Sequence, residues 1–357
     1  MTARRSADLL NALALVAPGS PLRDGLDRIL LAGMGALIVV ADGPEVLNIC
    51  SGGFLLDAAY SPQRLSELAK MDGAIILAPD ASRIARANVH LVPNPNVPTS
   101  ETGTRHRTAE RVARSISVPV ISVSQRMNVI SVYAAGEKHE IEPVPRVINR
   151  ANQAVQTLER YKARLDEVSV ALSALEIEDL VTLRDVVSVL QRNEMVARIA
   201  EEIEGYIIEL GEDGRLVRLQ LEELMGGIGD DRRLVVRDYF SEAGDWELND
   251  ALRSLEELSN DQLLDLRRVA ATLHAGVGVP DLDQQMSPRG YRLLSRIPRL
   301  PVPVVEAIVE RFGALQKILR ATIDDLDDVE GVGSTRARAI KDGLSRLAEA
   351  SILDRYT

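Results

Sequence analysis

The first part of the chain alternates short apolar runs with segments in which apolar residues have helical spacing. Continuous apolar runs of strand length occur at Ala36–Val40 and Ala74–Ala78, and such runs are typical of buried strands. Apolar residues recur at helical spacing in Pro21–Leu31 and again from Ala109 to Ile116. We therefore predict an α/β domain with a central mixed sheet in residues 1–145.

Past Pro143-Val144-Pro145 the apolar residues keep helical spacing for a long way. Residues near heptad spacing extend from Val155 to Leu175, which favours a long packed helix. Residues 146–285 contain no catalytic constellation, so we expect a helical linker or spacer domain there. A third domain, also all-α, is expected in residues 286–357.

The C-terminal domain contains Val329-Glu330-Gly331-Val332-Gly333 ahead of a helical pattern. This order resembles a helix-hairpin-helix motif, in which glycines let backbone N–H groups at a helix start touch a DNA phosphate. Ile297-Pro298-Arg299-Leu300-Pro301 looks like a degenerate first copy without the hairpin glycines. The expected DNA-binding residues are Gly331, Gly333, Ser334, Thr335, Arg336, Arg338 and Lys341. The alternative is a glycine turn within a helical scaffold.

Charge and composition narrow the classes of function. The chain has a net charge of −11, which excludes a uniformly basic coat for nucleic acid. Residues 286–357, however, hold 12 Lys and Arg against 10 Asp and Glu, so a DNA surface is expected there. One cysteine and four histidines give no disulfide and no zinc-ligand spacing. Because no apolar run reaches transmembrane length, we expect a soluble, cytoplasmic protein without a membrane partner.

Two polar motifs lie at element boundaries of the predicted α/β domain. Asp72-Gly73 precedes the apolar run at Ala74, where the aspartate supplies a carboxylate and the glycine lets a ligand approach the backbone. Thr104–Thr108 contains two arginines and lies at the start of the next predicted helix, where backbone N–H groups and the helix dipole favour an anion. Taken singly, the first motif is an ordinary turn and the second a solvated charge cluster. Together they suit a nucleoside triphosphate with its metal.

The pair Asp-Gly-Ala at 72–74 and Arg-His-Arg at 105–107 resembles the signature of diadenylate cyclases. Flanking residues match as well, among them Ser61-Pro62, Leu91-Val92-Pro93 and Ala109-Glu110-Arg111. The resemblance covers nearly the whole chain, tail included, and points to the DNA integrity scanning (DisA) family. It implies that two ATP molecules give cyclic di-AMP and two pyrophosphates, each ribose 3′-hydroxyl attacking the α-phosphate of the other ATP.

The resemblance also implies cofactors, partners and assembly. The cofactor would be Mg²⁺ or Mn²⁺. The partners would be ATP, branched or junction DNA, and DNA-repair proteins. The family assembles as an octamer with cyclase domains face to face, so the active site would form between subunits. DNA of junction type would lower cyclase activity.

The roles of the motif residues follow from the resemblance. Asp72 would ligate the metal or accept the 3′-hydroxyl proton, and these two roles stay open. Arg105 and Arg107 would hold the pyrophosphate, while His106 would contact phosphate or support the loop. The expected ATP-binding residues are Asp72, Gly73, Ala74, Leu91, Thr104, Arg105, His106, Arg107 and Thr108.

Two other functions are compatible with these sequence features. A different metal-dependent nucleotidyltransferase, acting for example on DNA, would need a pair of catalytic carboxylates, and the sequence offers one clear candidate. A non-enzymatic DNA-repair adaptor would need only the helix-hairpin-helix tail. Incubation with ATP and a divalent metal, followed by identification of the product, separates all three functions.

Overall fold

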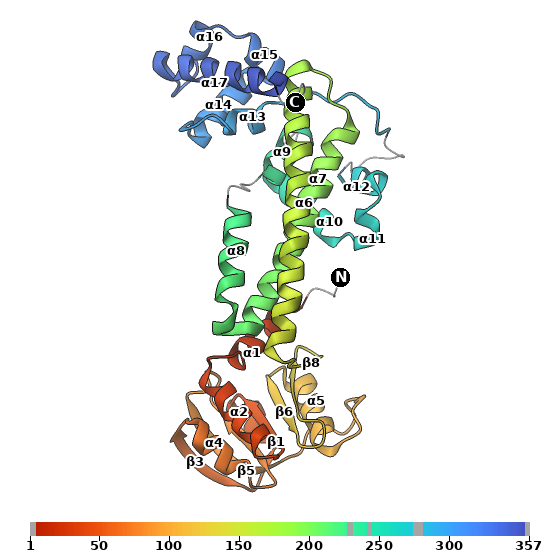
Figure 1. Ribbon diagram of the computed structural model, residues 1–357, viewed down its shortest axis with the longest axis vertical. Coiled ribbons are helices and arrows are strands. Elements are labelled where there is room, and N and C mark those ends of the chain that lie inside the picture. Colours follow the sequence, from red (N-terminus) through yellow and green to blue (C-terminus); the bar gives the residue numbers. More distant parts are fainter. Residues whose placement is uncertain (1–4, 227–230, 241–244, 274–280, 354–357) are drawn as a thin grey trace. The chain divides into compact units, whose positions relative to one another are not determined.

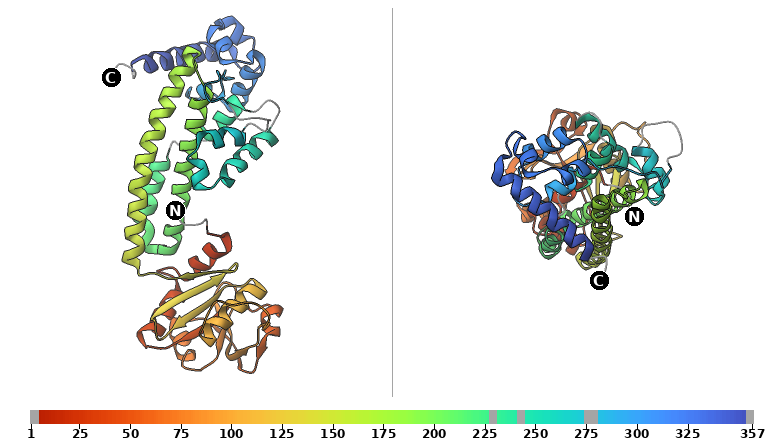
Figure 2. Two further views of the ribbon diagram at one scale, coloured as in Figure 1. Left: turned by 90° about the vertical axis from the view of Figure 1, so that its right-hand side faces the viewer. Right: turned by 90° about the horizontal axis from the view of Figure 1, so that it is seen from above.

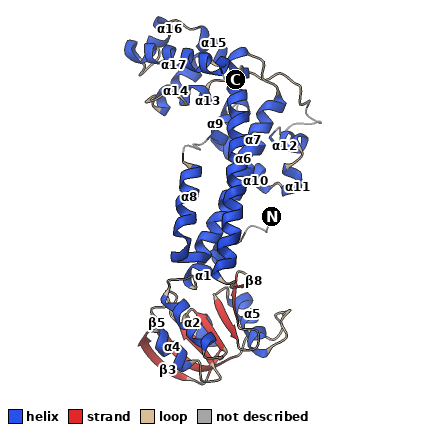
Figure 3. Ribbon diagram, in the orientation of Figure 1, coloured by secondary structure: helices blue, strands red, loops and turns tan. Residues whose placement is uncertain are grey.

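The strands of the computed structural model all lie between residues 36 and 140 (Figure 3). The structure describes residues 5–226, 231–240, 245–273 and 281–353. The N-terminal helices are α1 (Ala7–Leu15), α2 (Pro21–Leu31), α3 (Pro44–Asn48), α4 (Pro62–Leu68) and α5 (Thr104–Ile116). The strands are β1 (Ala36–Val40), β2 (Cys50–Ser51), β3 (Phe54–Ala59), β4 (Ala74–Leu77), β5 (Arg83–Leu91), β6 (Val120–Ser124), β7 (Val129–Ala134) and β8 (Glu137–Glu140).

These strands form one eight-stranded mixed sheet. Its order is β2-β5-β4-β1-β6-β7-β8, with β3 also paired to β5. β1 and β4 are parallel, whereas the neighbouring pairs β1–β6 and β4–β5 are antiparallel. In the chain α2 precedes β1 and α4 precedes β4, so helices alternate with strands. The prediction of an α/β domain with a central mixed sheet is therefore confirmed.

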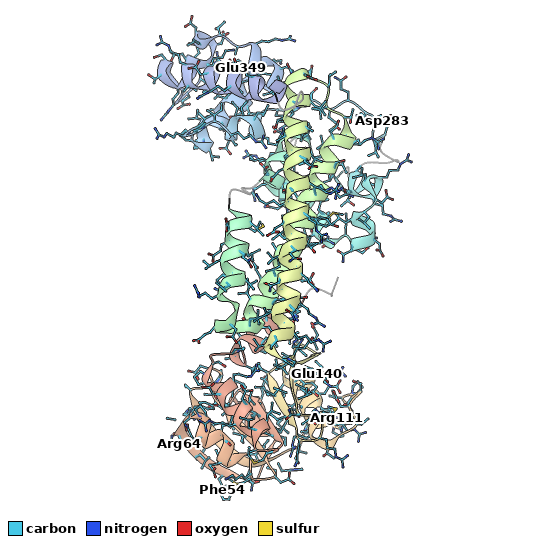
Figure 4. The ribbon with its side chains drawn as sticks, in the orientation of Figure 1. Phe54, Arg64, Arg111, Glu140, Asp283 and Glu349 are labelled. Carbon is cyan, nitrogen blue, oxygen red and sulfur yellow. The ribbon has the colours of Figure 1, made fainter. Side chains whose placement is uncertain are left out.

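Each face of the sheet has its own hydrophobic core. Ile38 and Ile75 point to the face covered by α1, α2 and α4, while Leu37 and Ile76 point to the face covered by α5. Alternate residues of a strand point to opposite faces, so a strand buried on both sides must be apolar throughout. The five residues of β1 are all buried. Figure 4 labels Arg64 on α4 and Arg111 on α5, which lie at opposite sides of this domain.

β3 and β8 are strands that apolar patterning does not predict, because both are polar or exposed. In β3 five of the six residues are exposed, so neither face of the strand imposes an apolar period. β8 consists of Glu137, Lys138, His139 and Glu140, and it pairs only with β7 at the end of the sheet. Both strands are defined by backbone hydrogen bonds to a neighbouring strand and not by burial. The hydrophobic periodicity of a sequence carries no information about such bonds.

The remaining described chain is helical. Two long helices, α6 (Val144–Glu178) and α7 (Leu183–Leu210), lie side by side in Figures 1 and 2. They are followed by η1 (Gly211–Gly214), α8 (Arg215–Met225), α9 (Asp231–Tyr239), α10 (Asp245–Glu257), α11 (Asn260–Leu263) and α12 (Leu266–Leu273). Within the described ranges, we find no helix that has both the length and the apolar character to cross a membrane.

Contacts divide the chain into two compact units. One contains residues up to 155 together with 201–222, and the other contains 156–200 and the residues from 223 onward. The contacts thus assign the start of α6, the end of α7 and most of α8 to the sheet unit. The division at residues 145 and 285 that the sequence suggests stays a prediction.

The C-terminal helices have a hydrophobic core of their own and contain two similar hairpins. The helices are α13 (Tyr291–Ser295), α14 (Val302–Phe312), α15 (Leu315–Arg320), α16 (Ile323–Asp327) and α17 (Gly333–Leu353). Between α16 and α17, Val329 N–H donates to Leu326 and Val332 N–H donates to Val329. Thirty-two positions earlier, the N–H groups of Ile297 and Leu300 repeat this pattern, donating to Leu294 and Ile297.

A buried polar cluster fixes α13 to α6 and α9 within the second unit. The Arg292 side chain, which is 0% exposed, donates to Glu176 Oε2 at 2.5 Å and to Ser173 at 3.0 Å. The Asp238 carboxylate accepts three backbone N–H groups at the start of α13. Burial, together with the Glu176 carboxylate, raises the pKa of Asp238 to about 7. Breaking a buried ion pair by removing one partner costs about 3–5 kcal/mol, so this cluster holds the first tail helix firmly.

Candidate functional site

Asp72 lies in the bend between α4 and β4. α4 begins as predicted, with Ser61 as N-cap accepting from Arg64 N–H and with Pro62 at the first helical position. The chain then reaches Asp72, whose side chain is fully exposed. An exposed carboxylate just before a buried strand has a fixed backbone position and full access to a ligand.

Gly73 lies against the backbone of β5. A Cβ added at Gly73 would come within 2.4 Å of the Asn88 carbonyl carbon, which no real side chain tolerates. Asn88 itself has a φ of 54°, and the β4–β5 register shifts close by, between Ala74 and Ile76. The glycine is therefore required for β4 to pair with this irregular part of β5.

The start of α5 presents uncapped backbone donors. Gly103 is the N-cap residue and has no side chain to cap the helix. The Arg107 N–H donates to the Gly103 carbonyl at 2.8 Å, so the preceding N–H groups at the helix start are directed outward. The position of Thr104–Thr108 in the first turn of a helix is as predicted, and it forms an anion-binding geometry.

The two motifs meet through an ion pair. Arg105 Nη2 lies 3.4 Å from Asp72 Oδ1, across 33 residues of sequence. The guanidinium fits because residue 35 is glycine: a Cβ there would lie 2.0 Å from Arg105 Nη1. Gly35 stands just before β1. In the sequence it is only a glycine ahead of an apolar run, so its function in making room for Arg105 was missed.

His106 is hydrogen-bonded to Tyr133, which begins a group of side chains to which the sequence assigns no role. Its Nδ1 lies 3.0 Å from the Tyr133 hydroxyl, and that hydroxyl donates to Glu101 Oε1 at 3.0 Å. Lys138 on β8 pairs with the same Glu101 oxygen at 2.8 Å. Burial lowers the pKa of His106, against the opposing effect of the Glu101 charge. Burial raises the pKa of Tyr133, and the Glu101 carboxylate raises it further.

Most of the other residues predicted to bind ATP are buried or have side chains that bond within the protein. Ala74 and Leu91 are buried, at 3% and 5% exposed, so a nucleotide would meet their backbone rather than their side chains. The Thr108 hydroxyl donates to the Thr104 carbonyl one turn back. The Arg107 residue is exposed and stands in the same helical turn as Arg105.

In the tail, most of the predicted DNA-binding residues lie on one exposed helix start. Gly331 and Gly333 have φ values of 81° and 62°, which glycine adopts without strain. Ser334, Thr335, Arg336 and Arg338 are exposed. Lys341 is different, because its ammonium donates to the Leu319 carbonyl at 2.9 Å and is half-buried.

A divalent metal fits the site at Asp72 only together with a substrate. Among the described residues there is no group of three or more His, Cys, Asp or Glu side chains that would hold a metal by itself. Mg²⁺ is commonly bound by one or two carboxylates plus substrate phosphates. The exposed Asp72 carboxylate beside an anion-binding helix start meets that requirement.

Comparison with known proteins places the chain in a family. Residues 23–138 match the model described as DisA bacterial checkpoint controller nucleotide-binding, and residues 141–280 match the DisA bacterial checkpoint controller linker region. The DNA integrity scanning protein DisA of Frankia alni is 58% identical over 347 residues, 96% of each chain. The protein of the same name from Kineococcus radiotolerans is 58% identical over 350 residues, 98% of this chain and 97% of its own.

Proposed function

This chain belongs to the DisA family of DNA integrity scanning proteins and is a diadenylate cyclase, and we propose that it makes cyclic di-AMP at an interface between two subunits. In the proposed reaction, O3′ of each ATP forms a bond to the α-phosphorus of the other ATP. The bond from each α-phosphorus to pyrophosphate breaks, and each 3′-hydroxyl loses its proton. The products are one cyclic di-AMP, two pyrophosphates and two protons. Because ATP and DNA are both cytoplasmic in bacteria, we propose that the protein is cytoplasmic.

The observation that supports this proposal most directly is the pairing of Asp72 with Arg105. A carboxylate and a guanidinium 3.4 Å apart bring the two motifs to one place on the surface. Because Asp72 and Arg105 contact each other, ATP would replace their ion pair when it binds, with the helix start and Arg105 on the leaving-group side of its α-phosphate. Asp72 would then lie on the side of the incoming 3′-hydroxyl, so the two ends of the reaction have separate groups.

Each residue of the site has a specific role in the proposal. Asp72 accepts the 3′-hydroxyl proton or holds the metal. Arg105 and Arg107 bind the leaving pyrophosphate in fork geometry, and the N–H groups at the start of α5 neutralise its charge. No covalent intermediate is needed, so catalysis consists of positioning and electrostatic stabilisation.

The proposed cofactor is Mg²⁺ or Mn²⁺, held by Asp72 and the phosphates. When bound, the metal supplies positive charge to the α-phosphate and lowers the pKa of the attacking hydroxyl. Asp72 is suited to hold it because its carboxylate is fully exposed. A Cβ at Gly73 would point into Asn88 of β5, so this glycine holds the backbone beside Asp72 against that strand and does not by itself make room for the nucleoside.

The assembly follows from the symmetry of the product. Cyclic di-AMP has two equivalent halves, and one sheet domain would bind one ATP, so two domains must face each other across a two-fold axis. We expect an octamer, as the family resemblance implies. Light scattering on the active fraction should give a mass well above the 39.0 kDa of one chain. An active monomer would contradict the shared site.

The tail is proposed to bind branched DNA through phosphates and to lower cyclase activity when it does. Backbone N–H groups at the start of α17, together with exposed Arg336 and Arg338, recognise phosphate oxygens rather than base edges. Binding should therefore tolerate different sequences and weaken with salt. Several tails in one assembly would favour junctions over a linear duplex.

Replacing Arg336 and Arg338 together by Ala should weaken junction binding and make its salt dependence shallower by about two units of log–log slope. The reason is the loss of two phosphate contacts. Arg346→Ala, also exposed on α17, removes a similar charge away from the hairpin and serves as the control. A gel-shift titration at several salt concentrations measures both. Equal slopes for the double variant and the control would contradict a hairpin DNA site.

A further inference from the structure

A chain of hydrogen bonds runs from the edge strand of the sheet to the start of α5. Lys138 on β8 contacts Glu101, Glu101 accepts the Tyr133 hydroxyl, and that hydroxyl contacts His106. Tyr133 is 1% exposed, so its hydroxyl is held by these partners rather than by bulk water. The four residues come from β8, β7, α5 and the loop before α5. Because they are far apart in the sequence, no sequence motif reveals this series of hydrogen bonds.

The donors and acceptors in this series of hydrogen bonds determine which ring nitrogen of His106 carries the hydrogen. Glu101 pairs with Lys138, and although burial opposes it, hydrogen bonds from Lys138 and Tyr133 hold the pKa of Glu101 below its usual value. Glu101 is therefore an ionised carboxylate that only accepts. Tyr133 has one hydroxyl hydrogen, which it donates to Glu101. Its oxygen can then only accept from His106 Nδ1.

We propose that Tyr133 and Glu101 are positioning residues of the cyclase reaction, which hold the His106 ring with Nδ1 protonated and Nε2 directed to the nucleotide. With Nδ1 committed to Tyr133, Nε2 is the ring nitrogen left to contact a ligand. The ring sits between Arg105 and Arg107 in the first turn of α5, where the proposed site receives phosphate. A ring that is free to rotate or to exchange tautomers would offer the wrong nitrogen in part of the population.

The geometry favours positioning over simple packing. A packed aromatic ring needs no hydroxyl, and Phe would fill the same space in the core at Tyr133. Here the hydroxyl bridges a carboxylate to an imidazole on the helix that carries the motif, an arrangement in which the carboxylate orients the ring through the intermediate hydroxyl. Because the inference rests on the proposed cyclase reaction, its test must separate the failure of one from the failure of the other.

Tyr133→Phe should lower kcat for cyclic di-AMP by at least about 10-fold, since small misplacements of a positioned group cost this much or more. The KM for ATP should change by less than about threefold, because both arginines still bind phosphate. Tyr60→Phe is the matched control: Tyr60 is a half-buried tyrosine of the same domain whose hydroxyl donates to the Pro21 carbonyl. It should keep wild-type kcat. Melting temperatures of both variants show whether each is folded.

Two results would overturn the inference. The first is wild-type kcat in a folded Tyr133→Phe protein. The second comes from a His106→Gln background, where Tyr133→Phe should have little further effect; an equal loss in both backgrounds would show that Tyr133 does not act through His106. If His106→Gln makes no product, the kcat and KM of Tyr133→Phe in the wild-type background decide. Absence of cyclic di-AMP from the wild-type protein would instead contradict the proposed function.

Discussion

Asp72→Asn should abolish cyclic di-AMP synthesis, with turnover lower by at least about 100-fold, the range in which a lost proton acceptor falls. Asparagine has nearly the same shape but neither accepts the 3′-hydroxyl proton nor binds a divalent cation as a carboxylate does. The fold should be unaffected because the Asp72 side chain is fully exposed. Its surface ion pair with Arg105 contributes little to stability.

The assay follows product formation by mass spectrometry, with melting temperature and light scattering as checks on folding and assembly. Glu67→Gln is the matched control, because it removes one negative charge from an exposed side chain of α4 in the same domain. That variant should retain wild-type turnover. A folded Asp72→Asn protein with wild-type turnover would show that Asp72 has neither proposed role.

Replacing Arg105 and Arg107 together by Ala should weaken ATP binding by about 100-fold or more. Hydrogen bonds to charged groups contribute about 1.5–3 kcal/mol each, and two guanidinium groups are lost. Arg114→Ala is the control: Arg114 is exposed at the other end of α5 and pairs with Glu110. Calorimetric titration with ATP measures the affinity, and gel shifts with junction DNA should be unchanged. Unchanged ATP affinity in the double variant would rule out the phosphate-binding role.

The parts of the site that could be predicted are those encoded by local sequence. Ser61-Pro62 begins α4, the apolar run from Ala74 forms β4, and Thr104–Thr108 opens α5. Each depends on a cap, a buried face or a helical period within a few residues. The meeting of Asp72 and Arg105 was implied by the family motif and is consistent with the observed ion pair.

The parts that could not be predicted depend on sheet order. Gly35 matters because β1 lies beside β4, so that its approach to Arg105 exists only in three dimensions. Tyr133 reaches His106 because β7 follows β6 in the sheet under α5. The hydrophobic pattern of the sequence indicates neither the approach of Gly35 to Arg105 nor that of Tyr133 to His106.

The backbone of the first tail hairpin, at residues 297–301, could not be predicted from the sequence either. The sequence suggests a degenerate copy at 297–301 because hairpin glycines are lacking there. The structure gives Arg299 a φ of 63°, close to the 81° of Gly331 at the corresponding position. The backbone turn thus persists without glycine, at the cost of a strained residue. Tertiary packing of Ile297 and its neighbours in the tail core maintains it.

The most direct test of the central claim is the product that the purified chain makes from ATP. The protein is incubated with ATP and Mg²⁺, and separately with Mn²⁺, without DNA, and the products are identified by mass spectrometry. We expect cyclic di-AMP with at least one metal, and two pyrophosphates for each cyclic di-AMP. Unchanged ATP with both metals, or conversion to ADP and phosphate alone, would contradict the assignment of this site as a diadenylate cyclase.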